Sequence, residues 1–239
     1  MWQEIVDAVP LFVDGISVTL MYTVLGAVSA FVVSFVFGLM ALSPSILVRG
    51  VARTIVEFFR GTSLVVQLLW IYFALPLLGF RLDAIAAATL ALALNFGAYG
   101  SEIVRGAINA VPKAQWEATV ALSFTRLQRM RRVILPQAIP EMIPPFGNLV
   151  VQLLKGSSLL FLLSITELTF EVQELRKDIG SLPAFAIALV VYFVLAQVLI
   201  GLMRLWERRA SARVGRGRSK KVRMPEAAPS GGVGLGGLG

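Results

Sequence analysis

The chain has 239 residues, of which 57% are hydrophobic and only 15% are charged, with a mean hydropathy of +0.79. This composition is typical of a membrane protein and excludes an ordinary soluble domain. The chain has neither cysteine nor histidine, which excludes disulfides, thiol catalysis, imidazole acid–base chemistry and metal sites built from those ligands.

The first 14 residues contain acidic side chains but no Lys or Arg. A cleaved signal peptide begins with a basic region, so we predict none here. We expect residues 1–14 to form an external segment. The first span should then run over about 15–42, up to the turn signal Ser43-Pro44-Ser45.

Stretches that lack Asp, Glu, Lys and Arg predict most of the spans. They cover Gly15–Val48, Gly61–Phe80, Ala84–Ser101 and Ile179–Met203. Each has at least 18 residues, about enough helix to cross a hydrocarbon core of roughly 30 Å. A fifth apolar run, Met142–Thr166, is interrupted once, by Lys155. We therefore predict an all-α integral membrane bundle of five transmembrane helices, over about 15–42, 62–78, 84–106, 142–166 and 183–203.

The segments between these spans give further expectations. The third helix should continue past Glu102 towards Ala110, where Pro112 ends it. Four prolines between residues 136 and 145 predict a stepped entry into the fourth span rather than one straight helix. Residues 170–182 read as a connector, and the basic, Gly-rich tail over 207–239 reads as disordered.

The positions of the basic residues predict the orientation. If five spans alternate, 18 of the 22 Lys and Arg fall on one side, in residues 43–60, 104–137 and 204–239. The opposite side has only three. By the positive-inside tendency, the basic side is cytoplasmic and the N-terminus is outside. The net charge of +8 is better explained by this topology than by binding to nucleic acid.

A short polar stretch, residues 112–136, lies between the third and fourth spans. Its Trp116, Val120, Phe124 and Leu127 have a helical spacing suited to a groove. Thr125 and Gln128 form a potential capping box, which would start a second short helix just after Ser123. The Ser123 position needs a turn, and serine lacks glycine's access to positive φ.

This stretch closely resembles the coupling loop of ABC importer permeases, in which Glu-Ala-Ala precedes a Gly and a later Leu-Pro. Matching residues are Glu117, Ala118, Leu135 and Pro136, whereas Thr119, Ser123 and Val133 replace Ala, Gly and Ile of the pattern. The resemblance implies that Glu117, Ala118, Ala121, Ser123, Leu135 and Pro136 couple the chain to an ATPase. An ordinary interfacial amphipathic helix is the simpler alternative.

Further blocks resemble permeases for polar amino acids. They are Glu57–Thr62, Ala98–Gly106, Leu135–Ala138 and Lys155–Leu159, in the family's order. Residues 144–148 and 167–170 resemble the ectoine branch of this family, whose solutes are amino-acid-derived compatible solutes. The resemblance implies a permease domain over about 15–206 and transport of a polar amino acid or an amino-acid-derived compatible solute, without covalent chemistry or a cofactor.

The partners implied by the resemblance are ABC ATPase subunits, a second permease subunit of the same or a related chain, and an extracytoplasmic solute-binding protein. The chain has no Gly-x-x-x-x-Gly-Lys-Ser/Thr loop, so ATP must be bound and hydrolysed by another chain. The arginines at 126, 129, 131 and 132 suit either an ATPase surface or the anionic headgroups of membrane lipid.

Polar residues at membrane depth are the candidates for the translocation pathway or gate. They are Lys155, Tyr99, Asn95, Glu102, Asn148 and Gln152. A charge such as Lys155 within a span suggests a functional role, although backbone carbonyls freed at kinks could also satisfy it. For Glu102 the alternative is an ion pair with Arg105, and for the others it is interhelical hydrogen bonding.

Two other classes of protein fit a polytopic membrane chain. An ion-coupled secondary transporter often has internal repeats and carboxylates at the bilayer midplane, and neither is evident in this sequence. A structural membrane scaffold would not need a coupling loop.

Overall fold

The computed structural model describes residues 2–213, all of whose regular elements are helical. The α-helices are α1 (Trp2–Met40), α2 (Ile46–Gly61), α3 (Leu64–Leu69), α4 (Ala84–Asn109), α5 (Lys113–Ala121), α6 (Arg126–Arg129), α7 (Leu135–Gly156), α8 (Leu168–Ile179) and α9 (Ser181–Arg213). Short π or 3-10 segments occupy Trp70–Ala74, Leu75–Leu78, Met130–Ile134 and Ser157–Leu163. Residues 214–239, which hold most of the predicted disordered tail, lie outside the described range.

Four segments of the described chain are long and apolar enough to cross a membrane: Ala8–Met40, Ala84–Asn109, Arg126–Leu163 and Ser181–Glu207. A fifth crossing is obtained only if the pair α2 and α3, which bend by 105° at residues 62–63, counts as one broken span. The all-α, multi-span prediction is therefore confirmed. The predicted second span over about 62–78 corresponds to the continuous helical stretch Leu64–Leu78, in which α3 gives way after Leu69 to π and 3-10 turns.

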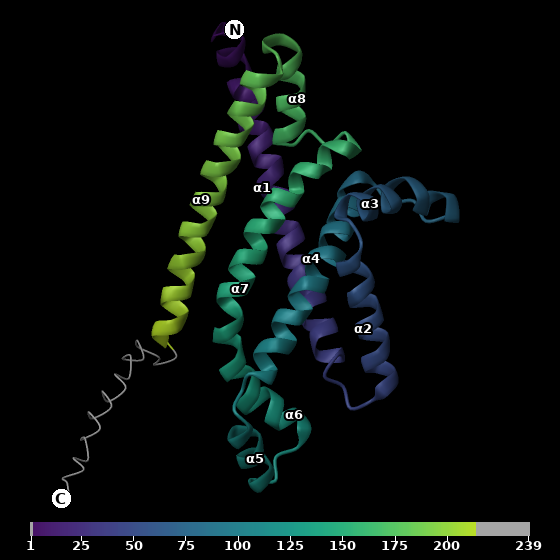
Figure 1. Cartoon of the computed structure of the whole chain (residues 1–239), viewed down its shortest axis with the longest axis vertical. Helices are drawn as coiled ribbons and strands as arrows, with labels where there is room; N and C mark the ends of the chain where they lie inside the picture. The colour runs from purple at the N-terminus through teal and green to yellow at the C-terminus, as the bar shows by residue number, and fades with distance from the viewer. Residues whose placement is uncertain (1, 214–239) are drawn as a thin grey trace, which may run out of the picture.

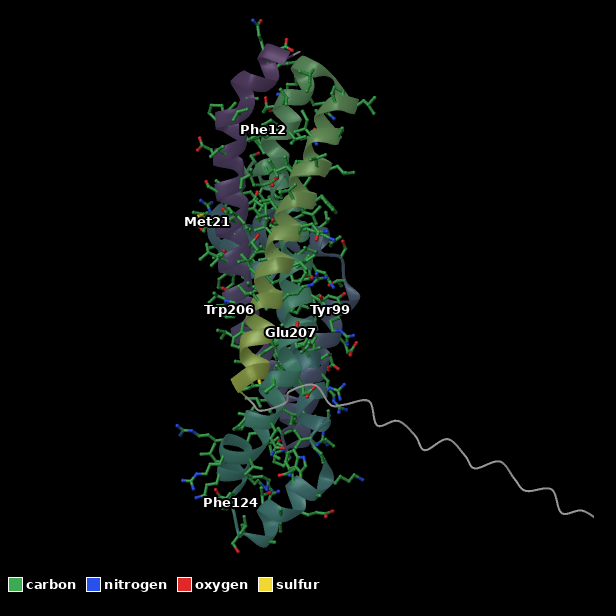
Figure 2. All side chains as sticks on the ribbon, turned by 90° about the vertical axis from the view of Figure 1, so that its left-hand side faces the viewer. Phe12, Met21, Tyr99, Phe124, Trp206 and Glu207 are labelled. Carbon is green, nitrogen blue, oxygen red and sulfur yellow. The ribbon has the colours of Figure 1, made fainter. Side chains whose placement is uncertain are left out.

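The long helices run side by side, as Figure 1 shows, with α8 and the N-terminus at one end and α5 and α6 at the other. We call these the α8 end and the α5–α6 end. The α3 segment turns sideways out of the bundle (Figure 1). Figure 2 shows the side chain of Phe12 near the α8 end and that of Phe124 at the α5–α6 end.

The most extensive helix contact, between α1 and α4, is built from small residues. Gly26, Ala30, Ser34 and Gly38 are four residues apart on α1 and form one buried stripe. Small residues at this spacing let two helix backbones approach closely in a membrane, where no hydrophobic force drives the helices together. The Ser34 hydroxyl also lies 3.2 Å from the Gly97 carbonyl oxygen of α4.

Glycines on both helices have no room for a side chain at this contact. A Cβ on Gly97 would overlap Val33, and one on Gly38 would lie 2.8 Å from the Cβ of Val104. Gly106, on the same helix as Gly97, has nothing within 4 Å of the corresponding position. The spacing of α1 and α4 therefore depends on glycine at particular positions.

At the α8 end, residues predicted to form a connector instead form a helix. α8 packs its buried Leu168, Val172 and Leu175 against α1 and α9. It lies between Ser164 and Gly180, both of which have positive φ. Helix α1 also begins at Trp2 and not near residue 15. Its first turns pack against α8, so the helix extends beyond the predicted span.

Helix α7 continues through Pro140, Pro144 and Pro145, so the predicted stepped entry is wrong. Pro136 lies in the first turn of α7, directly after the π segment Met130–Ile134. Ala138, Met142 and Leu149 are buried against neighbouring helices, and this packing holds the helix despite the lost bonds. The irregularity lies earlier, in the π segment Met130–Ile134.

A matched pair of substitutions tests the small-residue contact. Gly97→Ala should lower the free energy of unfolding by about 1–3 kcal/mol, because the new methyl group overlaps Val33. Gly106→Ala, on the same helix but facing open space, should change it little. Thermal unfolding of the two purified variants checks this, and equal stabilities would contradict the proposed close contact.

Candidate functional site

The predicted coupling loop forms two short helices at one end of the molecule (Figure 1). In α5, Thr119 is buried and Trp116 packs against the apolar cluster around Ile134. Glu117, Ala118 and Ala121 point the other way and are exposed. The helix is thus anchored on one face and free on the other.

The turn after α5 adopts the left-handed conformation that the motif's glycine favours. Ser123 has a φ of 55°, and the Phe124 N–H donates to the Thr119 carbonyl at 3.0 Å while the Ser123 N–H donates to Val120 at 2.9 Å. This pair of bonds is the Schellman motif that ends many helices. Serine therefore takes glycine's conformation here, at a cost of roughly 1–2 kcal/mol.

The predicted capping box is confirmed. The Gln128 N–H donates to the Thr125 hydroxyl at 3.3 Å, and the Thr125 N–H donates to the Gln128 side chain at 2.9 Å. This starts α6, and the chain then passes through the π segment to Leu135 and Pro136 at the start of α7.

The predicted apolar stripe along the loop is wrong as one continuous face. Helix α5 ends at Ala121, so the 3.6-residue period does not continue to Leu127. Trp116 faces the core, whereas Val120, Leu122 and Leu127 are exposed. These three apolar side chains lie in the same short loop as the exposed Glu117 and Ala118.

A cluster of polar side chains stabilises the break between α2 and α3. The helix end frees backbone carbonyls, and side chains bond three of them. The Thr62 hydroxyl donates to Phe58 at 2.8 Å, the Gln67 amide to Phe59 at 2.8 Å, and the Tyr99 hydroxyl to Arg60 at 3.2 Å.

Asn95 of α4 completes this arrangement. It is buried, and its amide nitrogen lies 3.3 Å from the Phe59 carbonyl and 3.1 Å from the Gln67 side-chain oxygen. The sequence reasoning identified Asn95 and Tyr99 as polar at membrane depth but missed Gln67. The available signal was a glutamine just after the Gly61-Thr62-Ser63 break, in an otherwise apolar stretch.

The ion pair predicted for Glu102 on α4 is present, and α2 has a second one at the same spacing. The carboxylates of Glu57 and Glu102 each pair with an arginine three residues later, Arg60 and Arg105. The guanidinium of Arg60 also lies 5.6 Å from the centre of the Tyr99 ring, within the range of a cation–π contact.

The remaining pathway candidates lie apart from this group, on α7. Asn148, Gln152 and Lys155 are exposed at helical spacing, and Glu141 and Pro144 continue the same face. We call this the polar face of α7. Among the described residues, no carboxylate pairs with Lys155. Polar and charged side chains at membrane depth face protein or water rather than lipid. The polar face of α7 must therefore be covered by protein or water.

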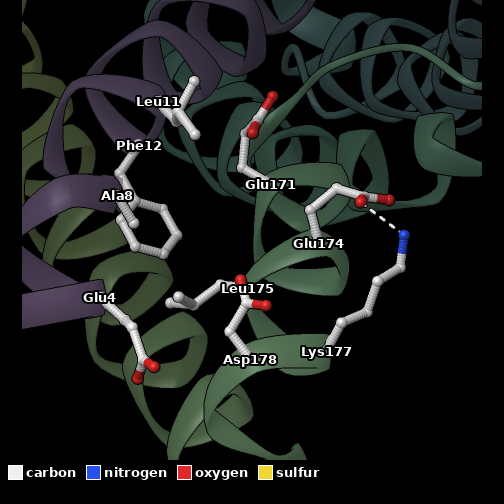
Figure 3. A pocket seen from close by; sticks show the side chains of 9 residues that line it. All are labelled: Glu4, Ala8, Leu11, Phe12, Glu171, Glu174, Leu175, Lys177 and Asp178. Carbon is white, nitrogen blue, oxygen red and sulfur yellow. Dashed lines mark hydrogen bonds and ion pairs between the residues drawn. The ribbon is translucent and has the colours of Figure 1, made fainter. Parts of the chain in front are cut away.

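A groove at the α8 end combines acidic and apolar residues, as Figure 3 shows. It has a volume of about 390 Å³, and its lining includes Phe12 and Leu11 of α1 with Glu171, Glu174 and Asp178 of α8. Glu174 forms an ion pair with Lys177. Burial raises the pKa of Glu171 above its usual value, and the neighbouring acids Glu174 and Asp14 raise it further.

Residues 30–212 match the family described as the inner membrane component of binding-protein-dependent transport systems. The chain belongs to this family. It is a multi-pass protein of the inner membrane, and membership excludes the alternative of an ion-coupled secondary transporter.

Several relatives are amino-acid transport proteins. A probable amino-acid ABC transporter permease of Sinorhizobium fredii is 46% identical over 200 residues, or 81% of this chain and 84% of the relative. The glutamine transport system permease of Escherichia coli is 36% identical, over 87% of this chain and 96% of the relative.

A solved structure supports the same assignment. The crystal structure of an amino acid ABC transporter with histidines contains a chain that is 34% identical, with a TM-score of 0.80, and the match covers 87% of this permease and 98% of that chain. This permease is therefore a subunit of an ABC importer. Such subunits are not themselves enzymes.

The role of Asn95 can be separated from general packing. Asn95→Leu should lower the free energy of unfolding by about 1–2 kcal/mol, because it removes donors from the Phe59 carbonyl and the Gln67 oxygen. Thr89→Val is the control on the same helix: its hydroxyl is buried without a hydrogen-bond partner, so removing it should be neutral or stabilising. Denaturation of both variants measures this, and a neutral Asn95→Leu would contradict a stabilising role for the Asn95 hydrogen bonds.

Proposed function

We propose that this permease imports a polar amino acid or an amino-acid-derived compatible solute, with ectoine as one candidate. The transport functions of the relatives support the solute class. The shape of α5 supports the driving step: Thr119 and Trp116 anchor the helix, while Glu117, Ala118 and Ala121 are free to contact an ATPase subunit. This anchored but exposed helix is the observation that carries the proposal.

Docking at α5 requires close approach and a fixed register. Ala118 and Ala121 present little bulk, and Glu117 offers an acceptor to donors on the partner. Because Trp116 packs on residues of the π segment that leads into α7, movement of α5 is transmitted to that span. Closure of two ATPase subunits on ATP would thereby open the permease outward to an external binding protein, and hydrolysis would reset it.

The polar face of α7 is the proposed wall of the translocation pathway. Lys155, Gln152 and Asn148 would meet water or solute there, and a second permease chain would form the opposite wall. Lys155 can attract the carboxylate of an amino-acid solute. Asn95 and Tyr99 would act indirectly, by holding the break between α2 and α3, and Glu102 with its arginine would lie towards the inner gate.

The α5–α6 end is proposed to face the cytoplasm and the α8 end the outside. The uneven distribution of Lys and Arg supports this orientation. Asp178 is exposed on α8, and the chain has no native cysteine. In Asp178→Cys, an impermeant thiol reagent should therefore label intact cells. Labelling only after the membrane is opened would reverse the orientation.

The coupling role is tested by Glu117→Lys. Reversing the charge on the exposed face of α5 should reduce uptake and solute-stimulated ATP hydrolysis at least about tenfold, since a registered charged contact is worth more than about 1.4 kcal/mol. Arg81→Glu, a charge reversal at an exposed site outside the loop, is the control for a general effect of charge. Near-normal uptake by Glu117→Lys in the reconstituted complex would disprove the coupling assignment.

The pathway role is tested by Lys155→Met, measured as uptake into proteoliposomes beside the yield of assembled complex. Lys155 has no paired carboxylate in the described chain, so removing its charge should spare a desolvation cost and leave assembly intact. Uptake should nevertheless fall severalfold, and Lys155→Arg should restore it in part. Loss of assembly would indicate a structural role, and full uptake would remove Lys155 from the pathway.

A further inference from the structure

A fully buried carboxyl group lies at the junction of three helices near the α8 end. Glu167 has none of its surface exposed. It caps the N-terminus of α8 and contacts side chains of α1 and α9. None of the residues in the coupling loop, the α2–α3 break or the polar face of α7 takes part in this group, so the proposed transport mechanism does not explain it.

Besides the Thr169 N–H, whose hydrogen bond lowers the pKa of Glu167, two donors bond this carboxyl group. The Phe170 N–H donates to Oε1 at 3.2 Å, and the Tyr192 hydroxyl donates to Oε2 at 2.9 Å. Since Tyr192 has one hydrogen, the Thr169 hydroxyl 2.9 Å away donates to Tyr192 in turn.

The third contact, with Thr19 of α1, bears on the protonation state. The Thr19 hydroxyl lies 3.4 Å from Oε2 of Glu167, but it is closer, at 2.9 Å, to the Gly15 carbonyl oxygen. Its one hydrogen serves the shorter bond, and its oxygen accepts from the Leu168 N–H at 3.1 Å. A hydroxyl oxygen has a second lone pair, which can accept one more hydrogen. A proton on Oε2 of Glu167 would form a hydrogen bond to the Thr19 oxygen. An ionised carboxylate would instead place two acceptor oxygens against each other.

The charged groups around Glu167 do not supply a counter-ion. Packed against it are α1, α8, α9 and the 3-10 segment 157–163, and the last has no titratable side chain. The other titratable groups on the near parts of these helices are Asp14, Tyr22, Glu171, Glu174, Arg176, Lys177, Asp178 and Tyr192.

The two cations in that set are engaged elsewhere. Lys177 pairs with Glu174, and Arg176 lies over the Phe185 ring at 5.9 Å. Among the described residues, no cation pairs with Glu167. A buried carboxylate without a counter-ion is expensive, and the group takes up a proton instead. Consistent with this, burial raises the pKa of Glu167 above the usual 4.5.

We propose that Glu167 is a neutral carboxylic acid at neutral pH, and that in this form it latches α8 to α1 and α9. Ionisation at alkaline pH would leave an unpaired buried charge and release α8 from the bundle. The pKa of this acid is raised by folding, so the stabilisation is complete at acidic pH and is lost as the pH rises through the raised value. The latch would thus limit the stability of the α8 end at alkaline pH.

The test compares the full-length permease with Glu167→Gln in lipid nanodiscs. Glutamine keeps the shape and cannot ionise, and its amide can donate to Thr19 while Tyr192 donates to Thr169 instead. The wild-type unfolding temperature should fall by several degrees as the pH is raised from acidic to alkaline, with faster amide exchange confined to α8. Glu167→Gln should lose most of this dependence. Glu174→Gln, the same change at an exposed site on α8, should retain it.

Tyr192→Phe gives a second, independent readout. Phenylalanine preserves the packing of the ring but removes the hydroxyl that favours the charged carboxylate. The pKa of Glu167 should therefore rise further. The alkaline fall should therefore move to higher pH. Equal pH profiles for wild type and Glu167→Gln, or destabilisation of Glu167→Gln at every pH, would overturn the proposal. Neither measurement depends on uptake, so this failure is distinct from failure of the proposed function.

Discussion

The close approach of α1 and α4 is the constraint on which the rest of the structure depends. Gly26, Ala30, Ser34 and Gly38 form one face of α1, and the lack of side-chain bulk lets α4 lie against it. A residue of ordinary size at Gly97 would push these helices apart. Because α4 carries Asn95 and Tyr99, its position also decides whether those side chains can reach the α2–α3 break.

Buried polar groups at this depth have few water molecules to bond, so the protein must satisfy them internally. At the α2–α3 break, Gln67 and Asn95 both donate to the same carbonyl, that of Phe59. At the α8 end, Thr19 and Tyr192 surround Glu167. The polar face of α7 differs, because its side chains are left exposed in a single chain. That contrast is what separates a structural polar cluster from a candidate pathway.

Local sequence patterns predicted the local structure well. The capping box at Thr125 and Gln128, the end of α4 before Pro112 and the ion pair of Glu102 all involve residues within four positions of one another. Predictions that extrapolated a pattern across a boundary failed. The apolar stripe was interrupted by the end of α5, and the prolines of α7 did not break the helix because packing around Met142 and Leu149 compensates.

The sequence by itself determined that the chain is a helical membrane protein, where most spans lie, and which motifs the loop over residues 112–136 contains. These follow from composition, run length and short-range spacing. Only the tertiary structure decided which polar residues act together. Gln67 and Asn95 are 28 positions apart, and Thr19 and Glu167 are 148 apart. No periodicity connects such pairs, since their proximity depends on how α1, α4 and α8 pack.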